Sequence, residues 1–254
     1  MQIVRRLLER GTHGWVVRRR LPAEFGHAPI YVSPSARLGY LLRGMSAVDP
    51  SLLAFVRRFV HPGAVVWDVG ANVGLFTFAA AARAGSGGSV LSIEPDIWLV
   101  SLLRRTSLAQ AAASAPVTIV PCAIASSASL STFCVASRSR ASSALEGFDY
   151  RLQTGGVTER QAVLTVTLDW LLGFVPPPTV LKIDVEGAEL EVLRGSTHLF
   201  EIARPVVLCE VSSSFPEVTA YFHSRRYALF DGQQLDSGMI GISSAAWSTI
   251  AVPQ

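Results

Sequence analysis

The stretch VVWDVGANVGLF, from Val65 to Phe76, decides the fold of this chain. Its first residues are β-branched and aromatic, which is typical of a buried strand, and glycines follow within a few positions. Apolar residues with helical spacing then continue to Ala82. A strand, a glycine turn and a helix N-terminus in this order place backbone N–H groups and the positive end of a helix dipole against a ligand. The stretch therefore predicts a ligand-binding strand–loop–helix unit.

The spacing of the glycines bears on the identity of the ligand. Dinucleotide-binding loops have the pattern Gly-x-Gly-x-x-Gly, in which the second glycine lets the backbone approach a pyrophosphate. Here the glycines are Gly70 and Gly74, and Asn72 stands where that second glycine is required. A side chain at this position favours S-adenosylmethionine, which has no phosphate. Asp68 is expected to bind the amine of this cofactor, and the loop N–H groups or Asn72 its carboxylate.

The next predicted strand, Val90 to Ile93, ends at Glu94 and Pro95. An acidic residue about 20 positions after the glycine loop is the expected partner of the two ribose hydroxyls of a nucleotide cofactor. This feature fits both cofactor classes, and a strand-end acid on the surface is the structural alternative. Glu94 therefore supports a nucleoside ligand without distinguishing the two classes.

A second set of polar residues lies in LKIDVEGAE, Leu181 to Glu189, which ends another predicted buried strand. Ligands of open α/β sheets bind at the carboxyl ends of the strands, where Asp184 and Glu186 are expected. These acids also suit the capping and the positive end of the following helix, so a structural role is an alternative. Lys182 falls within the strand, and an unpaired buried charge is costly. We therefore expect Lys182 to pair with an acid close to the cofactor or substrate.

Two further chemistries remain open for this region. Asp184 and Glu210, at the ends of predicted neighbouring strands, could with Glu186 hold magnesium through oxygen ligands. Paired strand-end acids are common without a metal, so magnesium is an alternative and no metal ligands are predicted. His198 is a weaker candidate for a base, because a single histidine on a helix more often has a surface or structural role.

The composition indicates a globular protein with one large core, since half of the 254 residues are apolar and 16% are charged. No apolar run is long enough to span a bilayer, and the arginine-interrupted first 21 residues do not resemble a secretory signal. The widely spaced Cys122, Cys134 and Cys209 are expected to be reduced and mostly buried, as in a cytoplasmic protein. The net charge of +3 is too small to indicate nucleic-acid binding.

Predicted strands and helices alternate along the chain. The predicted strands are Val65–Trp67, Val90–Ile93, Val117–Val120, Leu130–Val135, Val163–Leu168, Val180–Asp184, Val206–Cys209, Tyr227–Phe230 and Ser248–Val252. One helix is predicted after the cap Asp49, and five more follow the strands that end near residues 67, 93, 168, 184 and 209. The helix after the strand Val90–Ile93 is predicted to run to Ala112. This order predicts an α/β fold, with a Rossmann-like, doubly wound and mostly parallel sheet, helices on both faces and a C-terminal antiparallel hairpin.

The chain is predicted to consist of an accessory segment, residues 1–47, and one domain, residues 48–254. In the accessory segment, Ile3 to Arg10 predicts a helix with a basic face, and Ile30 to Val32 is a strand candidate. The basic helix would contact an anionic membrane surface or a lipid-linked substrate, or would simply pack on the domain edge.

The serine-rich stretch from Ser137 to Gly156 predicts a flexible loop. Its arginines, Arg138, Arg140 and Arg151, would meet a phosphate or carboxylate, and solvated charges explain them equally well. We expect this loop and the first 47 residues to shape an acceptor pocket.

Taken together, the motifs of the chain resemble those of the FkbM-type S-adenosylmethionine-dependent methyltransferases. The resemblance rests on DVGANVGLFT (Asp68–Thr77), IEPD (Ile93–Asp96), TLDWLL (Thr167–Leu172), KIDVEGAELEVLRG (Lys182–Gly195) and RPVVLCEV (Arg204–Val211). It covers about residues 48–212. It implies a class I methyltransferase fold and methylation of a hydroxyl, usually on a sugar, polyketide or other natural-product scaffold.

The resemblance also implies which residues form the site. The implied cofactor residues are Asp68, Gly70, Asn72, Gly74, Phe76, Glu94, Pro95 and Ala123. Lys182, Asp184 and Glu186 would face the substrate, with Asp184 or Glu186 as the base and Lys182 holding that carboxylate or stabilising an alkoxide. Ser107 departs from the family pattern, which has an asparagine there, so adenine or ribose contacts at this position are not implied.

The sequence thus predicts an S-adenosylmethionine-dependent O-methyltransferase whose acceptor is a small-molecule or glycan hydroxyl on a sugar, glycolipid, polyketide or other natural product. One alternative is a cofactor-binding or partner module without catalysis, against which the intact Asp184 and Glu186 argue. Another is an NAD-dependent oxidoreductase. The sequence predicts neither the acceptor itself nor an oligomeric state.

Overall fold

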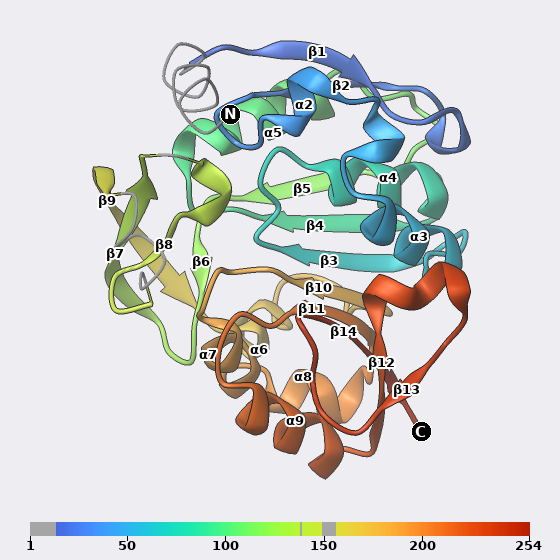
Figure 1. Cartoon of the computed structure of the whole chain (residues 1–254), viewed down its shortest axis with the longest axis vertical. Coiled ribbons are helices and arrows are strands. Elements are labelled where there is room, and N and C mark those ends of the chain that lie inside the picture. The colour runs from blue at the N-terminus through green and yellow to red at the C-terminus, as the bar shows by residue number, and fades with distance from the viewer. Residues whose placement is uncertain (1–13, 138, 149–155) are drawn as a thin grey trace.

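The computed structural model describes residues 14–137, 139–148 and 156–254, with an eight-stranded sheet at its centre (Figure 1). The strand order is β13-β12-β14-β11-β10-β3-β4-β5. These strands are β3 (Val65–Val69), β4 (Ser89–Ile93), β5 (Val117–Val120), β10 (Val180–Ile183), β11 (Val206–Glu210), β12 (Tyr227–Asp231), β13 (Gly241–Ile242) and β14 (Ser248–Pro253). Pairing is parallel from β11 to β5 and antiparallel from β11 to β13. The predicted doubly wound sheet with a C-terminal antiparallel hairpin is confirmed.

Two layers of helices cover the sheet because its strands alternate apolar side chains between the two faces. Val66 and Val90 pack toward α3–α5, whereas Trp67 and Leu91 pack toward α6–α9 (Figure 1). The helices are α3 (Pro50–Phe59), α4 (Leu75–Ala84), α5 (Ile97–Ser107), α6 (Leu168–Leu171), α7 (Glu189–Arg194), α8 (Thr197–Ile202) and α9 (Phe215–Ser224). The strand order reverses between β3 and β10, and such a switch point is where open α/β sheets bind ligands.

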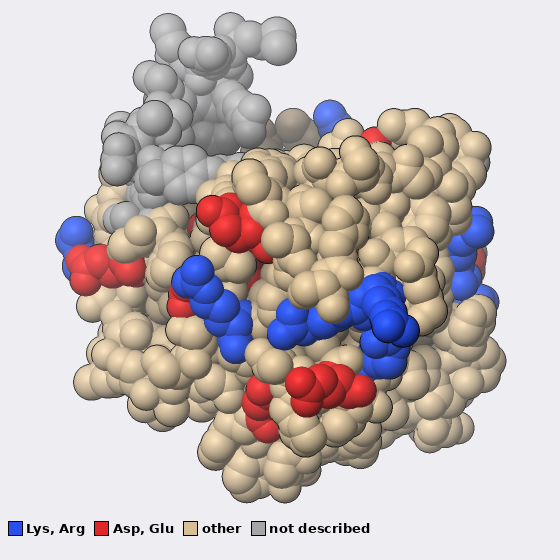
Figure 2. All heavy atoms as spheres, turned by 90° about the horizontal axis from the view of Figure 1, so that it is seen from below, with Lys and Arg blue, Asp and Glu red and all other residues tan. Residues whose placement is uncertain are grey.

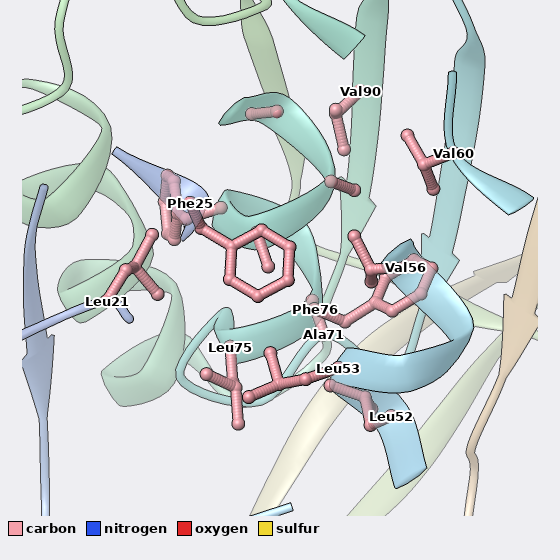
Figure 3. Close-up of a cluster of buried hydrophobic side chains, with 14 of the residues drawn as sticks. Leu21, Phe25, Leu52, Leu53, Val56, Val60, Ala71, Leu75, Phe76 and Val90 are labelled. Atoms are coloured by element: carbon pink, nitrogen blue, oxygen red, sulfur yellow. The ribbon is translucent and has the colours of Figure 1, made fainter. Parts of the chain in front are cut away.

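The described part of the N-terminal segment packs into the same core as the sheet. Its strands β1 (Val17–Arg20) and β2 (Pro29–Val32) form a hairpin, followed by α2 (Gly39–Leu42). Figure 3 shows Leu21 and Phe25 in one cluster with side chains of α3 and α4. The strand predicted at residues 30–32 is confirmed. The basic helix predicted at residues 3–10 lies outside the described residues, and the domain boundary at residue 48 stays a prediction.

A second, four-stranded sheet is inserted between β5 and β10, with the order β6-β9-β7-β8. Its strands are β6 (Ala123–Ile124), β7 (Ser129–Ala136), β8 (Ala144–Leu145) and β9 (Val157–Val166). The sequence predicted a strand at Leu130–Val135 and a flexible loop up to Gly156. Within the described residues the loop prediction is wrong in part, because β8 and the 3₁₀ turn η3 (Arg140–Ser142) are ordered elements. The extra strand residues were missed because the first half of β9 is mostly exposed and polar, so only pairing with β7 identifies it.

Helix α5 ends at Ser107 rather than at the predicted Ala112. The residues that follow leave the core, and the Leu108 side chain is almost fully exposed. Alanine-rich sequence without a buried face gives little helical stability on its own. The length of the helix is therefore set by its contact with the sheet.

The composition led us to expect reduced, mostly buried cysteines and no membrane-spanning segment. The three cysteines are buried and not disulfide-bonded. No helix in the described ranges is long and apolar enough to cross a membrane. On the face seen in Figure 2, from below Figure 1, Lys and Arg side chains gather in short groups beside Asp and Glu side chains.

Candidate active site

A cavity of about 640 Å³ opens at the carboxyl ends of β3, β4, β10 and β11. It lies at the switch point between β3 and β10, where the sheet topology predicts a ligand site. All but two of the predicted site residues line this cavity. The residues that line it are Gly70, Asn72, Phe76, Glu94, Pro95, Ala123, Lys182, Asp184 and Glu186. The two exceptions, Asp68 and Gly74, lie behind the wall.

The glycine loop has a backbone that only glycine fits at two places. A side chain at Gly70, whose φ is 76°, would place Cβ 1.8 Å from the carbonyl oxygen of Asp184. At Gly74, whose φ is 90°, Cβ would lie 2.5 Å from the ring of Phe78. Gly70 thus lets the loop cross the end of β10. Gly74 lets the start of α4 pack directly against the buried side chains of Phe78 and Leu103.

The backbone N–H groups of residues 70–74 all have acceptors within the chain. Two of them donate to the carbonyl of Ile93 at 3.0 Å, one to Glu94 at 2.7 Å, one to Asn72 Oδ1 at 2.8 Å and one to the carbonyl of Ala71 at 2.9 Å. No N–H of the loop remains to bind a pyrophosphate, which argues against a dinucleotide. The same geometry leaves none of these five N–H groups to bind the carboxylate of a cofactor, so it does not support that expectation. The Oδ1 atom of Asn72 accepts the hydrogen bond from the N–H of Val73, within the loop itself.

Glu94 lies at the end of β4 and is only 5% exposed. Its carboxylate accepts hydrogen bonds from the N–H of Asn72 and, at 2.9 Å, from that of Asp96. Burial, only partly offset by these two hydrogen bonds, raises the pKa of Glu94 to about 8. Because each carboxylate oxygen has two lone pairs, one on each oxygen remains for a hydroxyl donor in the cavity.

Lys182 and Asp68 form a buried pair beneath the loop. The Lys182 ammonium donates to Asp68 at 3.1 Å and to the carbonyl of Gly70 at 2.8 Å, and Thr77 donates to the other oxygen of Asp68 at 2.5 Å. Burial by itself lowers the pKa of Lys182, but the nearby carboxylates of Asp68, Asp184 and Glu210 outweigh it and raise the pKa. The expected pairing of Lys182 with an acid is confirmed.

The position of Asp68 corrects its predicted role. Its side chain is fully buried, its two oxygens are engaged by Lys182 and Thr77, and it does not line the cavity. A direct contact between Asp68 and the amine of a cofactor therefore does not follow from this geometry. Asp68 instead fixes Lys182, which in turn fixes the loop through the carbonyl of Gly70.

Three carboxylates face the cavity beside Lys182. Asp184 follows β10 and lies 3.4 Å from the Lys182 ammonium, and Glu210 ends the adjacent strand β11. The charge of Asp184, together with burial, raises the pKa of Glu210 to about 8. Glu186 lies in a left-handed turn with a φ of 52°. This part of the site therefore places the Lys182 ammonium beside Asp184, and Asp184 beside a Glu210 whose pKa is raised.

The turn that carries Glu186 is held from behind by Glu189. The carboxylate of Glu189 is almost fully buried and accepts from the N–H of Gly187 at 2.8 Å and from Ser212 at 3.1 Å. Gly187, with a φ of 113°, continues the strained turn. Glu189 thus has the structural role that the sequence left open for the acids of this stretch.

Two alternatives for this region find no support in the described ranges. No group of three or more His, Cys, Asp or Glu side chains there is arranged to hold a metal ion, so the magnesium alternative gains nothing from the geometry. His198 lies on α8, is mostly exposed, and faces Glu201 at 3.7 Å rather than the cavity. It is not a base for this site.

The remaining walls of the cavity come in part from the two segments that the sequence expected to shape a pocket. Arg37 and Tyr40 belong to the first 47 residues, Arg140 belongs to the loop from Ser137 to Gly156, and Asp49 lies just outside the first segment. Asp49 was predicted as a helix cap, which it is, since it accepts from the N–H of Leu52 at 3.1 Å. It also pairs with Arg37 at 3.1 Å. No spacing in the sequence indicates that a capping residue faces a cavity.

Comparison with known proteins adds the family. The family described as Methyltransferase FkbM domain matches residues 68–229. The hexuronic acid methyltransferase AglP of Haloferax volcanii is 30% identical over 146 residues, which are 57% of this chain and 54% of AglP. The chain thus spans about half the length of this relative.

Solved structures resemble the chain at lower identity. The FkbM methyltransferase of Methylobacillus flagellatus KT has a TM-score of 0.48 at 18% identity, over 78% of this chain and 49% of that one. The O-methyltransferase of Bacillus cereus, in complex with S-adenosylhomocysteine, has a TM-score of 0.45 at 12% identity over 100% of both chains. The family match itself covers more than half of this chain and includes the glycine loop and the end of β10. The chain belongs to the FkbM methyltransferase family.

Proposed function

We propose that this chain is an S-adenosylmethionine-dependent O-methyltransferase that methylates a hydroxyl group of a sugar or related scaffold. The observation that carries the proposal is the combination of two features. The Glu94 carboxylate is buried at the end of β4 and held by the N–H of Asn72, and Asn72 stands where a pyrophosphate-binding loop requires a glycine. A ribose with two free hydroxyls suits such a carboxylate. Family membership supports the same reaction class.

The residues around the cavity suit S-adenosylmethionine better than a dinucleotide. The N–H groups of residues 70–74 all have acceptors within the chain, and Asn72 stands where a pyrophosphate-binding loop has a glycine. Gly70, Asn72, Phe76, Glu94, Pro95 and Ala123 would hold the cofactor. Asp68 and Gly74 would act from behind the wall, through Lys182 and through the packing of α4.

The acids at the ends of β10 and β11 would supply the proton chemistry. Bound S-adenosylmethionine supplies a methyl group already activated on a sulfonium sulfur. Asp184 or Glu186 would accept the hydroxyl proton of the acceptor and orient its oxygen. Lys182 would hold Asp184, from which it is 3.4 Å away, while its hydrogen bonds to Asp68 and Gly70 keep it away from the acceptor.

A hydroxyl-rich acceptor fits the cavity walls. Asp49, Asp184, Glu186 and Glu210 present carboxylates, which are acceptors for the hydroxyl donors of a sugar. The curated relative is named a hexuronic acid methyltransferase, which supports a sugar as the acceptor. A hexuronic acid carries both hydroxyls and a carboxylate, and the base offered by Asp184 or Glu186 favours the hydroxyl, since a carboxylate needs no deprotonation at neutral pH.

Cofactor binding is expected to release a proton from Glu94. Its pKa of about 8 leaves it mostly protonated at pH 7, and two ribose donors favour the ionised form. We expect roughly 0.9 proton per ligand at pH 7 and close to none above pH 9. The affinity for S-adenosylhomocysteine should accordingly rise as the pH increases toward 8 and level off above it. Calorimetry in buffers of different ionisation enthalpy measures both quantities.

The control for this proton is Glu94→Gln. Glu210 also has a raised pKa, so proton release that persists in Glu94→Gln would assign the proton to Glu210 instead. Binding of S-adenosylhomocysteine by the unaltered protein without any proton release at pH 7 would contradict the role of Glu94.

The reaction itself is tested with labelled methyl transfer from S-adenosylmethionine to hexuronic-acid-containing glycans. The label is expected in an ether, which survives mild alkali, and Asp184→Asn or Glu186→Gln should lower the rate by ~100-fold or more. Both variants should bind S-adenosylhomocysteine with nearly unchanged affinity. An alkali-labile ester as the product, or full turnover in both variants, would remove the base assignment.

A further inference from the structure

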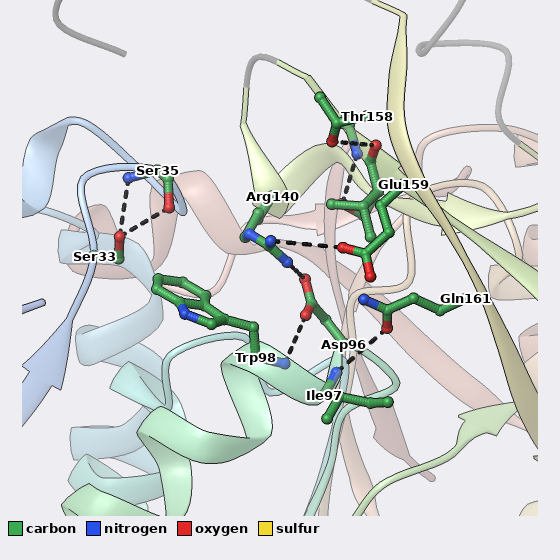
Figure 4. Close-up of polar contacts among 12 residues, drawn as sticks. Ser33, Ser35, Asp96, Ile97, Trp98, Arg140, Thr158, Glu159 and Gln161 are labelled. Atoms are coloured by element: carbon green, nitrogen blue, oxygen red, sulfur yellow. Dashed lines mark hydrogen bonds and ion pairs between the residues drawn. The ribbon is translucent and has the colours of Figure 1, made fainter. Parts of the chain in front are cut away.

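Arg140 is not a solvated loop residue. It lies in η3, is 9% exposed, and belongs to the cavity wall. Its guanidinium donates to the buried carboxylate of Asp96 and lies 4.9 Å from the ring centre of Trp98. The more exposed carboxylate of Glu159, on β9, is 3.9 Å away. Figure 4 shows Arg140 pointing from the inserted sheet toward the start of α5.

Asp96 connects Arg140 to the cofactor side of the cavity. One oxygen of Asp96 accepts from Arg140, and the other caps α5 by accepting from the N–H of Trp98 at 2.9 Å. The backbone N–H of Asp96 donates to Glu94 at 2.9 Å. The position of the Glu94 carboxylate thus depends on a turn that Arg140 holds in place.

The backbone around Arg140 also binds the N-terminal segment. The N–H of Arg140 donates to the carbonyl of Ser35 at 2.9 Å, and the hydroxyl of Ser139 donates to the carbonyl of Ala36 at 2.6 Å. Several of the residues from 37 to 51, which follow directly, line the same cavity. One short segment therefore joins the inserted sheet, the start of α5 and the N-terminal wall.

Stability alone is a weak reason for this arrangement. A buried ion pair contributes little more than well-packed apolar side chains would, whereas removing one partner leaves a costly buried charge. The ion pair between Arg140 and Asp96 instead fixes the orientation of the Asp96 carboxylate, because the planar guanidinium contacts a carboxylate and a ring face from defined directions. The carboxylate that it orients lies two residues from Glu94.

We propose that Arg140 is a positioning residue of the cofactor site, which acts through Asp96 to fix the Glu94 carboxylate for the ribose hydroxyls. The inference rests on the proposed function, since the ribose is that of S-adenosylmethionine. Arg140 itself touches Asp96 rather than the reacting groups.

The test is the titration of Glu94 together with ligand binding in Arg140→Gln. Glu94 is surrounded by Asp96, by Lys182 from β10 and, through Asp96, by Arg140 and Glu159. Without Arg140 the charge of Asp96 is uncompensated, so the midpoint of Glu94 should move to higher pH. Carboxyl ¹³C NMR of the free protein follows this midpoint, and calorimetry should give about tenfold weaker binding of S-adenosylhomocysteine at pH 7.

Three further variants separate positioning from general damage. Arg160→Gln removes an exposed arginine of the same sheet, whose partner Glu146 is 3.6 Å away, and should change neither quantity. Arg140→Lys keeps the charge, so the midpoint of the Glu94 titration should lie close to that of the unaltered protein. This comparison holds even if Arg140→Gln folds poorly. In the double variant Arg140→Gln with Asp96→Asn, the midpoint of the Glu94 titration should lie at lower pH than in Arg140→Gln alone. The binding of S-adenosylhomocysteine should stay weak.

The outcomes distinguish this inference from the proposed function. An unchanged Glu94 midpoint and unchanged binding in Arg140→Gln would overturn the inference. If the midpoint moves but the unaltered protein does not bind S-adenosylhomocysteine, the link between Arg140 and Glu94 stands and the proposed function fails.

Discussion

Lys182→Met is expected to lower the free energy of unfolding by about 3–5 kcal/mol and to reduce methyl transfer by ~100-fold or more. The substitution leaves the Asp68 carboxylate fully buried without its cation. It also removes the donor to the carbonyl of Gly70, so the glycine loop loses its tie to β10. Denaturant unfolding measures the first effect, and labelled methyl transfer measures the second.

Two comparisons make this prediction specific. The double variant Asp68→Asn with Lys182→Met should recover much of the lost stability, because no unpaired charge remains buried, while methyl transfer stays low. Arg57→Gln removes a cation from the half-exposed pair with Glu24 and should cost less than about 1 kcal/mol. A Lys182→Met protein as stable as Arg57→Gln would contradict the buried pair.

Gly70→Ala is expected to weaken binding of S-adenosylhomocysteine by ~100-fold, which is about 2.7 kcal/mol. The added Cβ would lie 1.8 Å from the carbonyl oxygen of Asp184, so the loop and the end of β10 must move apart. Both carry cavity residues. The strain of a positive φ costs about 1–2 kcal/mol, and the overpacking adds about 1–3 kcal/mol to the loss of stability. Calorimetry and denaturant unfolding measure the two effects.

Gly63→Ala is the matched control. Gly63 has a φ of 81°, close to that of Gly70, but its Cβ would meet nothing within 4 Å. It should therefore show the backbone strain alone, with unchanged ligand affinity. Equal losses of affinity in the two variants would mean that the close approach of loop and strand does not shape the site.

The sequence predicted the parts of the site that follow from local rules. The stretch from Val65 to Phe76 has the residue types of strand, turn and helix in one continuous order, and the structure has the same order. Lys182 could be assigned a partner because a lone buried cation is costly. Its partner Asp68 ends up behind the cavity wall because Lys182 and Thr77 engage its oxygens, and no spacing along the chain reveals that.

The parts that were missed depend on contacts between distant segments. The first half of strand β9 is recognisable only through its pairing with β7, since it is polar and mostly exposed. Arg140 lies in serine-rich sequence, and only the folded chain brings it to Asp96, 44 positions earlier. Because these walls are built by contacts between distant segments, they are the part of the cavity that local sequence patterns predict least.

The proposed function depends on whether Glu94 and the loop from Gly70 to Gly74 bind S-adenosylmethionine rather than a dinucleotide. Calorimetric titration of the full chain with S-adenosylhomocysteine and, separately, with NAD⁺ tests it most directly. We expect saturable binding of one S-adenosylhomocysteine per chain, strongly weakened in Glu94→Gln, and no saturable binding of NAD⁺. Tight binding of NAD⁺ without binding of S-adenosylhomocysteine would contradict it.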